Sequence, residues 1–80
     1  MKRGLYSPKW KRTVLESARF WCDAKRELWC EEITQGRMRG LWEVKGWCVE
    51  GDGCFSVVKR GLSQGLAESV VQEWNAGLAK

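Results

Sequence analysis

The sequence predicts a single small domain of the α+β class, with the element order α-β-β-α. Apolar residues recur with the 3.6-residue period of a helix between Ser7 and Gly36, and again after Ser63. Residues 40–60 alternate instead with the two-residue period of a strand, and a glycine-rich turn at residues 50–53 divides them into two halves. A chain of 80 residues suffices for one core. We therefore expect a long N-terminal amphipathic helix and a shorter C-terminal helix, both packed on one face of a β-hairpin.

The first predicted helix has two competing start signals and one stop signal. Ser7 before Pro8 suits an N-cap followed by the first helical position, and Thr13 with Glu16 fits a capping box. Gly36 suits the left-handed residue that commonly ends a helix. We expect the apolar stripe of this helix to pack into the core. The stripe consists of Trp10, Val14, Leu15, Ala18, Trp21, Cys22, Leu28, Trp29 and Ile33. Phe20 falls on the polar side.

The alternation in the hairpin assigns its residues to two faces. The predicted core face carries Trp42, Val44, Gly46 and Cys48. The other face carries Leu41, Glu43, Lys45, Trp47 and Val49, so Trp47 is exposed there unless a bulge at Gly46 turns it inward. The turn at 50–53 leads into a second strand from Cys54. Residues 2–6 could add a short third strand.

The second predicted helix follows the hairpin and begins after Ser63, its expected N-cap. Its apolar residues occupy one arc, formed by Ala67, Val70, Val71, Trp74 and Leu78. Both helices should cover the same face of the hairpin, because a two-stranded ribbon alone is only marginally stable.

The positive charge of the chain lies in a basic N-terminal arm, residues 1–12, which overlaps the helix start at Ser7. The arm holds five cations and no acid, which leaves nine cations and ten acids for the αββα domain, residues 13–80. Cations interleaved with aromatics such as Tyr6 and Trp10 suit a phosphate backbone together with a base; the alternative is a solvated terminus. The candidate anion-binding or nucleic-acid-binding residues are Lys9, Lys11, Arg12, Arg37, Arg39, Lys59 and Arg60.

Composition excludes most enzyme chemistry. The chain has no His, which removes the commonest general base and the commonest transition-metal ligand, and no catalytic motif is present. We expect no enzyme activity, no cofactor and no catalytic residue. The sequence has no signal-peptide pattern and no apolar run of membrane-spanning length, so we expect a cytoplasmic protein that does not enter a membrane.

The four cysteines are spaced as C-x7-C and C-x5-C, unlike the ligand pairs of zinc fingers. On one continuous helix, Cys22 and Cys30 would lie about 12 Å apart along the axis, too far for a shared metal ion or a disulfide. We expect reduced thiols and no metal site. Two alternatives stay open: a four-cysteine metal site, and a bridge between Cys48 and Cys54 across the hairpin.

Large apolar residues outside the expected core are the candidates for binding a partner, since Trp is enriched among residues that dominate binding energy. These candidates are Tyr6, Trp10, Phe20, Leu41, Trp47 and Val49. The edges of the hairpin are also unpaired, which makes a homodimer through an open edge a further candidate.

In size, basic N-terminus, compact αββα order and lack of catalytic residues, the chain resembles the short accessory proteins of phages and mobile elements, a group that includes the anti-CRISPR inhibitors. The resemblance is limited to these general features, so no functional residue can be assigned from it. It implies a stoichiometric binder that inhibits or modulates a protein or protein–nucleic acid complex. The alternative is a regulatory protein that binds DNA or RNA directly through the basic arm.

Overall fold

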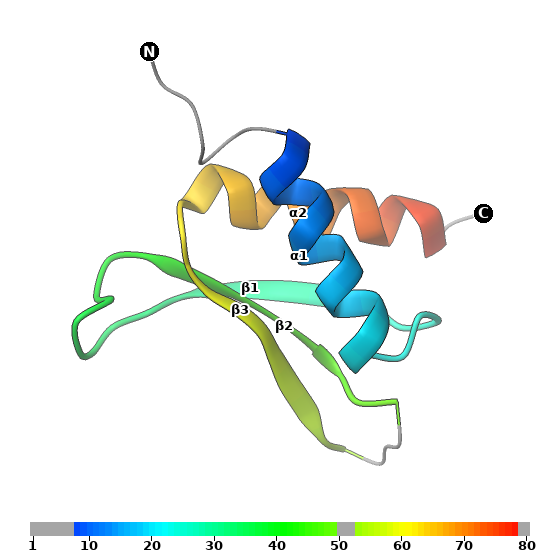
Figure 1. Ribbon diagram of the computed structural model, residues 1–80. Helices are drawn as coiled ribbons and strands as arrows, with labels where there is room; N and C mark the ends of the chain where they lie inside the picture. The colour runs from blue at the N-terminus through cyan, green and yellow to red at the C-terminus, as the bar shows by residue number, and fades with distance from the viewer. Residues whose placement is uncertain (1–7, 50–52, 79–80) are drawn as a thin grey trace.

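The computed structural model describes residues 8–49 and 53–78 and contains two helices and three strands in these ranges. In chain order they are α1 (Pro8–Trp21), β1 (Leu28–Glu32), β2 (Trp42–Trp47), β3 (Phe55–Leu62) and α2 (Gln64–Leu78). The strands form one antiparallel sheet in the order β1-β2-β3. Both helices lie on the same face of this sheet (Figure 1). The predicted α+β class is therefore confirmed, with three strands where the sequence predicted two.

The prediction of one helix from Ser7 to Gly36 is wrong beyond Trp21. The last helical bond runs from Cys22 N–H to the Ala18 carbonyl, and Asp23 then begins a turn. The Asp23 carboxylate accepts from Lys25 N–H at 2.9 Å and the Asp23 carbonyl from Arg26 N–H at 3.1 Å. Such local bonds from Asp compete with helix continuation. The chain then reverses into β1 instead of continuing as a helix.

β1 pairs with β2, and β2 pairs with β3 as the predicted hairpin. Gly36, predicted as a helix stop, does have a positive φ of 85°, but it lies in the loop between β1 and β2. The register between β2 and β3 shifts twice, and Gly61, with a φ of 81°, is the extra residue at one of these bulges. The short third strand that the sequence suggested at residues 2–6 lies outside the described residues.

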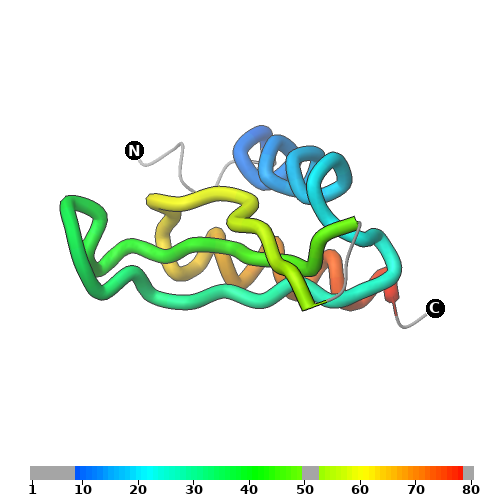
Figure 2. Tube along the Cα trace, turned by 90° about the horizontal axis from the view of Figure 1, so that it is seen from below, coloured from blue at the N-terminus to red at the C-terminus, as the bar shows by residue number. Residues whose placement is uncertain are grey.

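The core lies between the sheet and the two helices. Seen from below, α1 runs along the β3 side of the sheet while α2 lies behind β1 and β2 (Figure 2). The buried residues at the centre of this layer are Val14, Ala18, Cys22, Leu28, Val44, Val58, Leu62, Leu66, Ala67 and Val70, with Trp42 and Trp74 packed against them. The predicted core positions Trp42, Val44 and Gly46 of β2 are thus confirmed.

Two side chains fix α2 against its neighbours. Ser63 is its N-cap, as predicted, because its hydroxyl accepts from Leu66 N–H at 3.2 Å. Near the other end, Asn75 accepts from Leu28 N–H at 3.0 Å and donates to the Leu28 carbonyl at 3.2 Å. Asn75 therefore satisfies both backbone groups of Leu28 on the outer edge of β1. A homodimer through an open sheet edge stays a prediction, with β1 and β3 as the two edges.

None of the helices within residues 8–49 and 53–78 has the length and apolar character needed to cross a bilayer.

Candidate interaction surfaces

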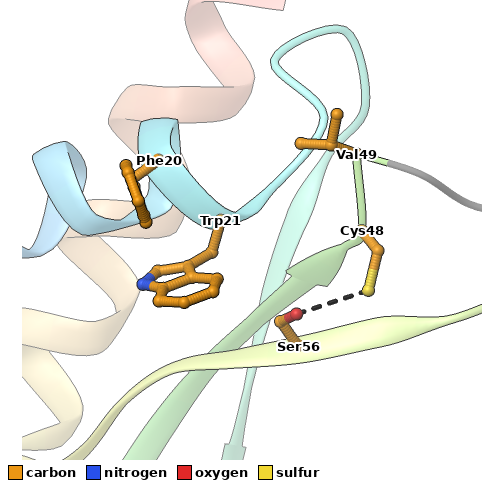
Figure 3. Close-up of a pocket in the computed structure, with 5 residues that line it drawn as sticks. All are labelled: Phe20, Trp21, Cys48, Val49 and Ser56. Atoms are coloured by element: carbon orange, nitrogen blue, oxygen red, sulfur yellow. Dashed lines mark hydrogen bonds between the residues drawn. The ribbon is translucent and has the colours of Figure 1, made fainter.

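Phe20 and Val49, two of the predicted partner-binding residues, lie together at one end of the molecule. With Trp21, Cys48 and Ser56 they line an open depression of about 410 Å³, which we call the apolar depression (Figure 3). Phe20 is 72% exposed, Trp21 56% and Val49 61%. The residues come from the last turn of α1, from the segment that directly follows β2 and from β3.

The end of α1 builds one wall of the depression. The rings of Phe20 and Trp21 pack edge to face, with centroids 4.8 Å apart and planes at 84°. The next residues attach the helix end to β2, because Cys22 forms an isolated bridge with Cys48 and Asp23 N–H donates to the Trp47 carbonyl at 2.8 Å. The backbone at the end of α1 is therefore attached to the end of the hairpin, and the two aromatic rings line the depression on the side opposite Val49 (Figure 3).

The prediction that Trp21 belongs to the core is wrong. α1 and the residue that follows it bury a narrow stripe, formed by Val14, Ala18 and Cys22 at a spacing of four residues. Trp21 and Trp10 fall at the edge of this stripe, and Trp10 is 43% exposed. The stop at Asp23 was the sequence signal that would have placed Trp21 at a helix end instead of inside a long helix.

Three large apolar side chains that line the depression are more than half exposed, namely Phe20, Trp21 and Val49. Aromatic side chains dominate the energetics of interfaces because each has about 150–250 Å² to bury. Exposed apolar surface that is gathered at one place often marks a binding site. The depression is therefore a candidate for the centre of a binding surface.

A second aromatic group lies on the sheet face away from the helices, and we call it the aromatic face. The Trp29 ring lies 5.2 Å from that of Trp47 and 5.9 Å from that of Phe55. The Arg26 guanidinium is 4.7 Å from the centroid of Trp47, and Lys45 Nζ is 5.1 Å from that of Phe55. Trp29 and Trp47 are half-buried, whereas Phe55 is 51% exposed, and a cation lies over the rings of Trp47 and Phe55.

The aromatic face corrects two predictions. Trp29 lies on a strand of this face and not on the core side of a helix, because β1 replaces the second half of the predicted helix. Trp47 does lie on the Glu43 and Lys45 face, without a bulge at Gly46, but it is half-buried against Trp29. The predicted exposed strip with Leu41 and Val49 does not form. Leu41 precedes β2 at the opposite end of the strand, and Val49 lines the apolar depression.

Ion pairs compensate much of the charge beside the aromatic face. Lys45 Nζ is 3.0 Å from Glu31 and 3.5 Å from Glu43, and Arg60 Nε donates to Glu43 at 3.1 Å. The Lys45 hydrogen bond, with a second one from the Trp29 indole, holds the pKa of Glu31 below its usual value. The Glu31 carboxylate in turn raises the pKa of Lys45. The charges of Lys45 and Arg60 are therefore balanced by Glu31 and Glu43, whereas Arg26 lies over the Trp47 ring.

The predicted anion-binding residues are not gathered at one place. Lys11 pairs with Glu73 at 2.9 Å and donates to Ser69 at 3.2 Å. Lys9 and Arg12 are exposed on α1 and form no ion pair with any residue in the described ranges, and neither does Arg19, which the sequence analysis did not select. The remaining candidates lie on other elements: Arg37 and Arg39 in the β1–β2 loop, and Lys59 and Arg60 on β3. Residues 8–12 of the predicted arm are the start of α1, and residues 1–7, including Tyr6, lie outside the described residues.

The cysteines occupy different environments. Cys22 is buried, and burial, followed by the neighbouring Cys48, raises the pKa of its thiol. Cys30 lies on β1 and not on a helix with Cys22, and burial also raises its pKa. Cys48 Sγ lies 2.7 Å from Cys54 Sγ and 3.3 Å from Ser56 Oγ. Within residues 8–49 and 53–78, no three Cys, Asp or Glu side chains lie close enough together to bind a metal ion.

Comparison of this chain with known protein families, curated proteins and solved structures finds no match.

Proposed function

We propose that this chain is a non-enzymatic interaction protein that docks on its partner through the apolar depression. The observation that carries the proposal is the exposure of Phe20, Trp21 and Val49 at one place. A standard interface buries about 800 Å² on each partner, and its energetic centre is a smaller cluster enriched in aromatic residues. Phe20 and Trp21, both more than half exposed, are aromatic residues of the kind that forms such a centre. The surrounding polar residues supply the rest of the contact.

The charge of α1 favours a partner with a negative surface. Lys9, Arg12 and Arg19 are exposed along the helix that ends in Phe20 and Trp21. A protein–nucleic acid complex offers an apolar protein site and phosphates together, so it complements both features. We therefore propose a nucleic-acid-handling complex in the cytoplasm as the partner. Occlusion of that complex would inhibit or modulate it, as the phage accessory proteins that the chain resembles in format do.

Capture with matched variants tests this proposal. The wild-type protein, Phe20→Ala and Leu41→Ala are immobilised and exposed to lysate of the cells in which the protein occurs, and bound proteins are identified by mass spectrometry. Leu41→Ala is the control because Leu41 is also an exposed apolar residue but lies at the other end of β2. We expect the wild type and Leu41→Ala to retain the same partner and Phe20→Ala to lose it, while the melting temperatures of all three agree. Equal capture by Phe20→Ala would contradict the proposal.

A second candidate function is direct binding of DNA or RNA through α1. It is favoured by the three cations Lys9, Arg12 and Arg19, which lie on one helix and form no ion pair with the described residues. Three phosphate contacts predict a log–log salt slope of about −2.7 on duplex DNA. Replacing the three cations by Gln should abolish this slope, whereas Phe20→Ala should leave it unchanged. Absence of DNA and RNA binding by the wild type at low salt would exclude this candidate.

A further inference from the structure

We infer that Cys48 and Cys54 are a disulfide-forming pair, which closes the turn between β2 and β3 when the protein meets an oxidised low-molecular-weight thiol such as glutathione disulfide. The inference concerns a modification site and does not depend on the proposed function.

Strand pairing places the two cysteines opposite each other. Trp47 and Phe55 are the last paired residues of β2 and β3, so Cys48 and Cys54 form the next cross-strand pair. Cys48 N–H donates to the Cys54 carbonyl at 3.0 Å. Residues directly opposite in an antiparallel ladder have Cα atoms about 4.5–5.5 Å apart, inside the range of about 4.4–6.8 Å that disulfides adopt.

The sulfur atoms are already close. The two Sγ atoms lie 2.7 Å apart, and the covalent bond requires about 2.05 Å. The remaining difference is small enough for a rotation of either side chain to close it.

Exposure singles out Cys54 as the thiol that reacts first. Cys54 is exposed, Cys48 and Cys30 are half-buried, and Cys22 is buried in the core. Thiolates are the reacting species, and burial raises the pKa of both Cys22 and Cys30. An oxidant in solution thus meets Cys54 first.

The reaction proceeds by two thiol–disulfide exchanges. The Cys54 thiolate attacks one sulfur of glutathione disulfide, which forms a mixed disulfide and releases one glutathione thiolate. The Cys48 thiolate then attacks Cys54 Sγ, which forms the Cys48–Cys54 bond and releases the second glutathione. The two cysteines lose two electrons and two protons, and glutathione disulfide gains them as two glutathione thiols.

Closing the segment 48–54 should stabilise the fold. A cross-link removes loop-closure entropy from the unfolded chain, and for a seven-residue segment the stabilisation is modest. In a domain of this size we expect the melting temperature to rise by roughly 5–15 °C. Dithiothreitol should reverse the rise.

Peptide mapping after oxidation tests the inference. The folded protein is incubated with glutathione disulfide, remaining thiols are alkylated under denaturing conditions, and the protein is cleaved after Lys and Arg. Cys22, Cys30 and the Cys48–Cys54 pair then lie in separate peptides, 20–25, 27–37 and 46–59. We expect peptide 46–59 to lack two hydrogens and carry no alkyl group or glutathione, with peptides 20–25 and 27–37 alkylated.

Two variants provide the controls. Cys30→Ser keeps the pair and should behave like the wild type, both in the peptide map and in the rise of its melting temperature on oxidation. Cys54→Ser should show no internal bridge and no rise. Alkylation of both Cys48 and Cys54, a persistent glutathione adduct on either, or a cross-link between peptides 20–25 and 46–59 would overturn the inference.

Discussion

Replacing Gly46 by alanine should destabilise the fold, although a change from glycine to alanine usually stabilises a protein where the backbone conformation permits it. Gly46 lies on the helix-facing side of β2, opposite Leu28 of β1 and Ser56 of β3. A Cβ at this position would lie 2.5 Å from Leu28 Cδ2 and 2.8 Å from Cys22 Sγ. Carbon atoms pack best at about 3.5–4.0 Å, so the new methyl group overlaps its neighbours by about 1 Å.

The magnitude follows from where these neighbours lie. Leu28 and Cys22 are both buried, so their side chains can make room only by displacing other residues of the core. Overpacking of this kind costs about 1–3 kcal/mol. The φ of Gly46 is not among the positive ones, so alanine can adopt the same backbone conformation. Alanine also lowers the conformational entropy of the unfolded chain, which offsets the loss of stability by about 0.4–1 kcal/mol. The expected net loss is about 1–2 kcal/mol, or a fall in melting temperature of roughly 5–15 °C.

Thermal and urea unfolding measure this loss, and Gly77→Ala is the matched control. Gly77 lies in α2 with nothing within 4 Å of an added Cβ, so the same change there should stabilise the protein by about 0.5 kcal/mol. In a Leu28→Val background, which lacks the Cδ atoms, the cost of Gly46→Ala should fall by about 1 kcal/mol. If Gly46→Ala were as stable as the wild type, the close approach of Cys22 and Leu28 to β2 would be refuted.

Two further predictions concern single side chains. Asn75→Ala should cost about 1–3 kcal/mol, since it removes both hydrogen bonds to Leu28; hydrogen exchange should find the Leu28 amide strongly deprotected, and an amide protected as in the wild type would contradict the role of Asn75. Because the pKa of Glu31 is lowered from 4.5 by Lys45 and Trp29, its contribution to stability is present above pH 4.5 and is lost as the pH falls through the folded pKa. Melting temperatures from pH 6 to pH 2 should therefore fall less steeply for Glu31→Gln than for the wild type, and parallel curves would contradict the interaction.

The parts of the fold that sequence reasoning predicted correctly are those with a long, unambiguous period. α2 has its N-cap at Ser63 and buries Ala67 and Val70 as predicted. In β2 the alternation assigned Val44 and Gly46 to the core face, which the structure confirms. The helical period of α2 extends over 15 residues, which is long enough to identify a helix. The alternation in β2 is identified as a strand because a glycine-rich turn follows it.

The failure at β1 has a physical cause. Leu28 to Glu32 is a five-residue strand, and so short a segment fits both a helical and an extended period. The turn at Asp23 decides between them, since its local hydrogen bonds compete with helix continuation. Because the sequence analysis did not recognise this turn, it extended the helix and assigned Trp21 and Trp29 to the core.

The candidate site was only partly predictable. Phe20 was identified because a large apolar residue on a polar helix face is conspicuous in the sequence. Val49 was identified for the wrong reason, as a member of a strip with Trp47, whereas it lines the same depression as Phe20. That arrangement depends on residues far apart in the chain, and no local pattern specifies how α1 crosses the sheet.

The neighbouring, tilted indoles of Trp29 and Trp47 on the aromatic face have an optical consequence. Trp29 and Trp47 have ring centroids 5.2 Å apart and planes inclined at 51°. Two such chromophores, close together and not parallel, couple their electronic transitions and give a paired positive and negative band in the far-ultraviolet circular dichroism spectrum. This signal overlaps the region used to measure helix content, so the spectrum of the native protein will not report its two helices faithfully. The difference spectrum between wild type and Trp29→Phe will instead report on the pairing of β1 with β2.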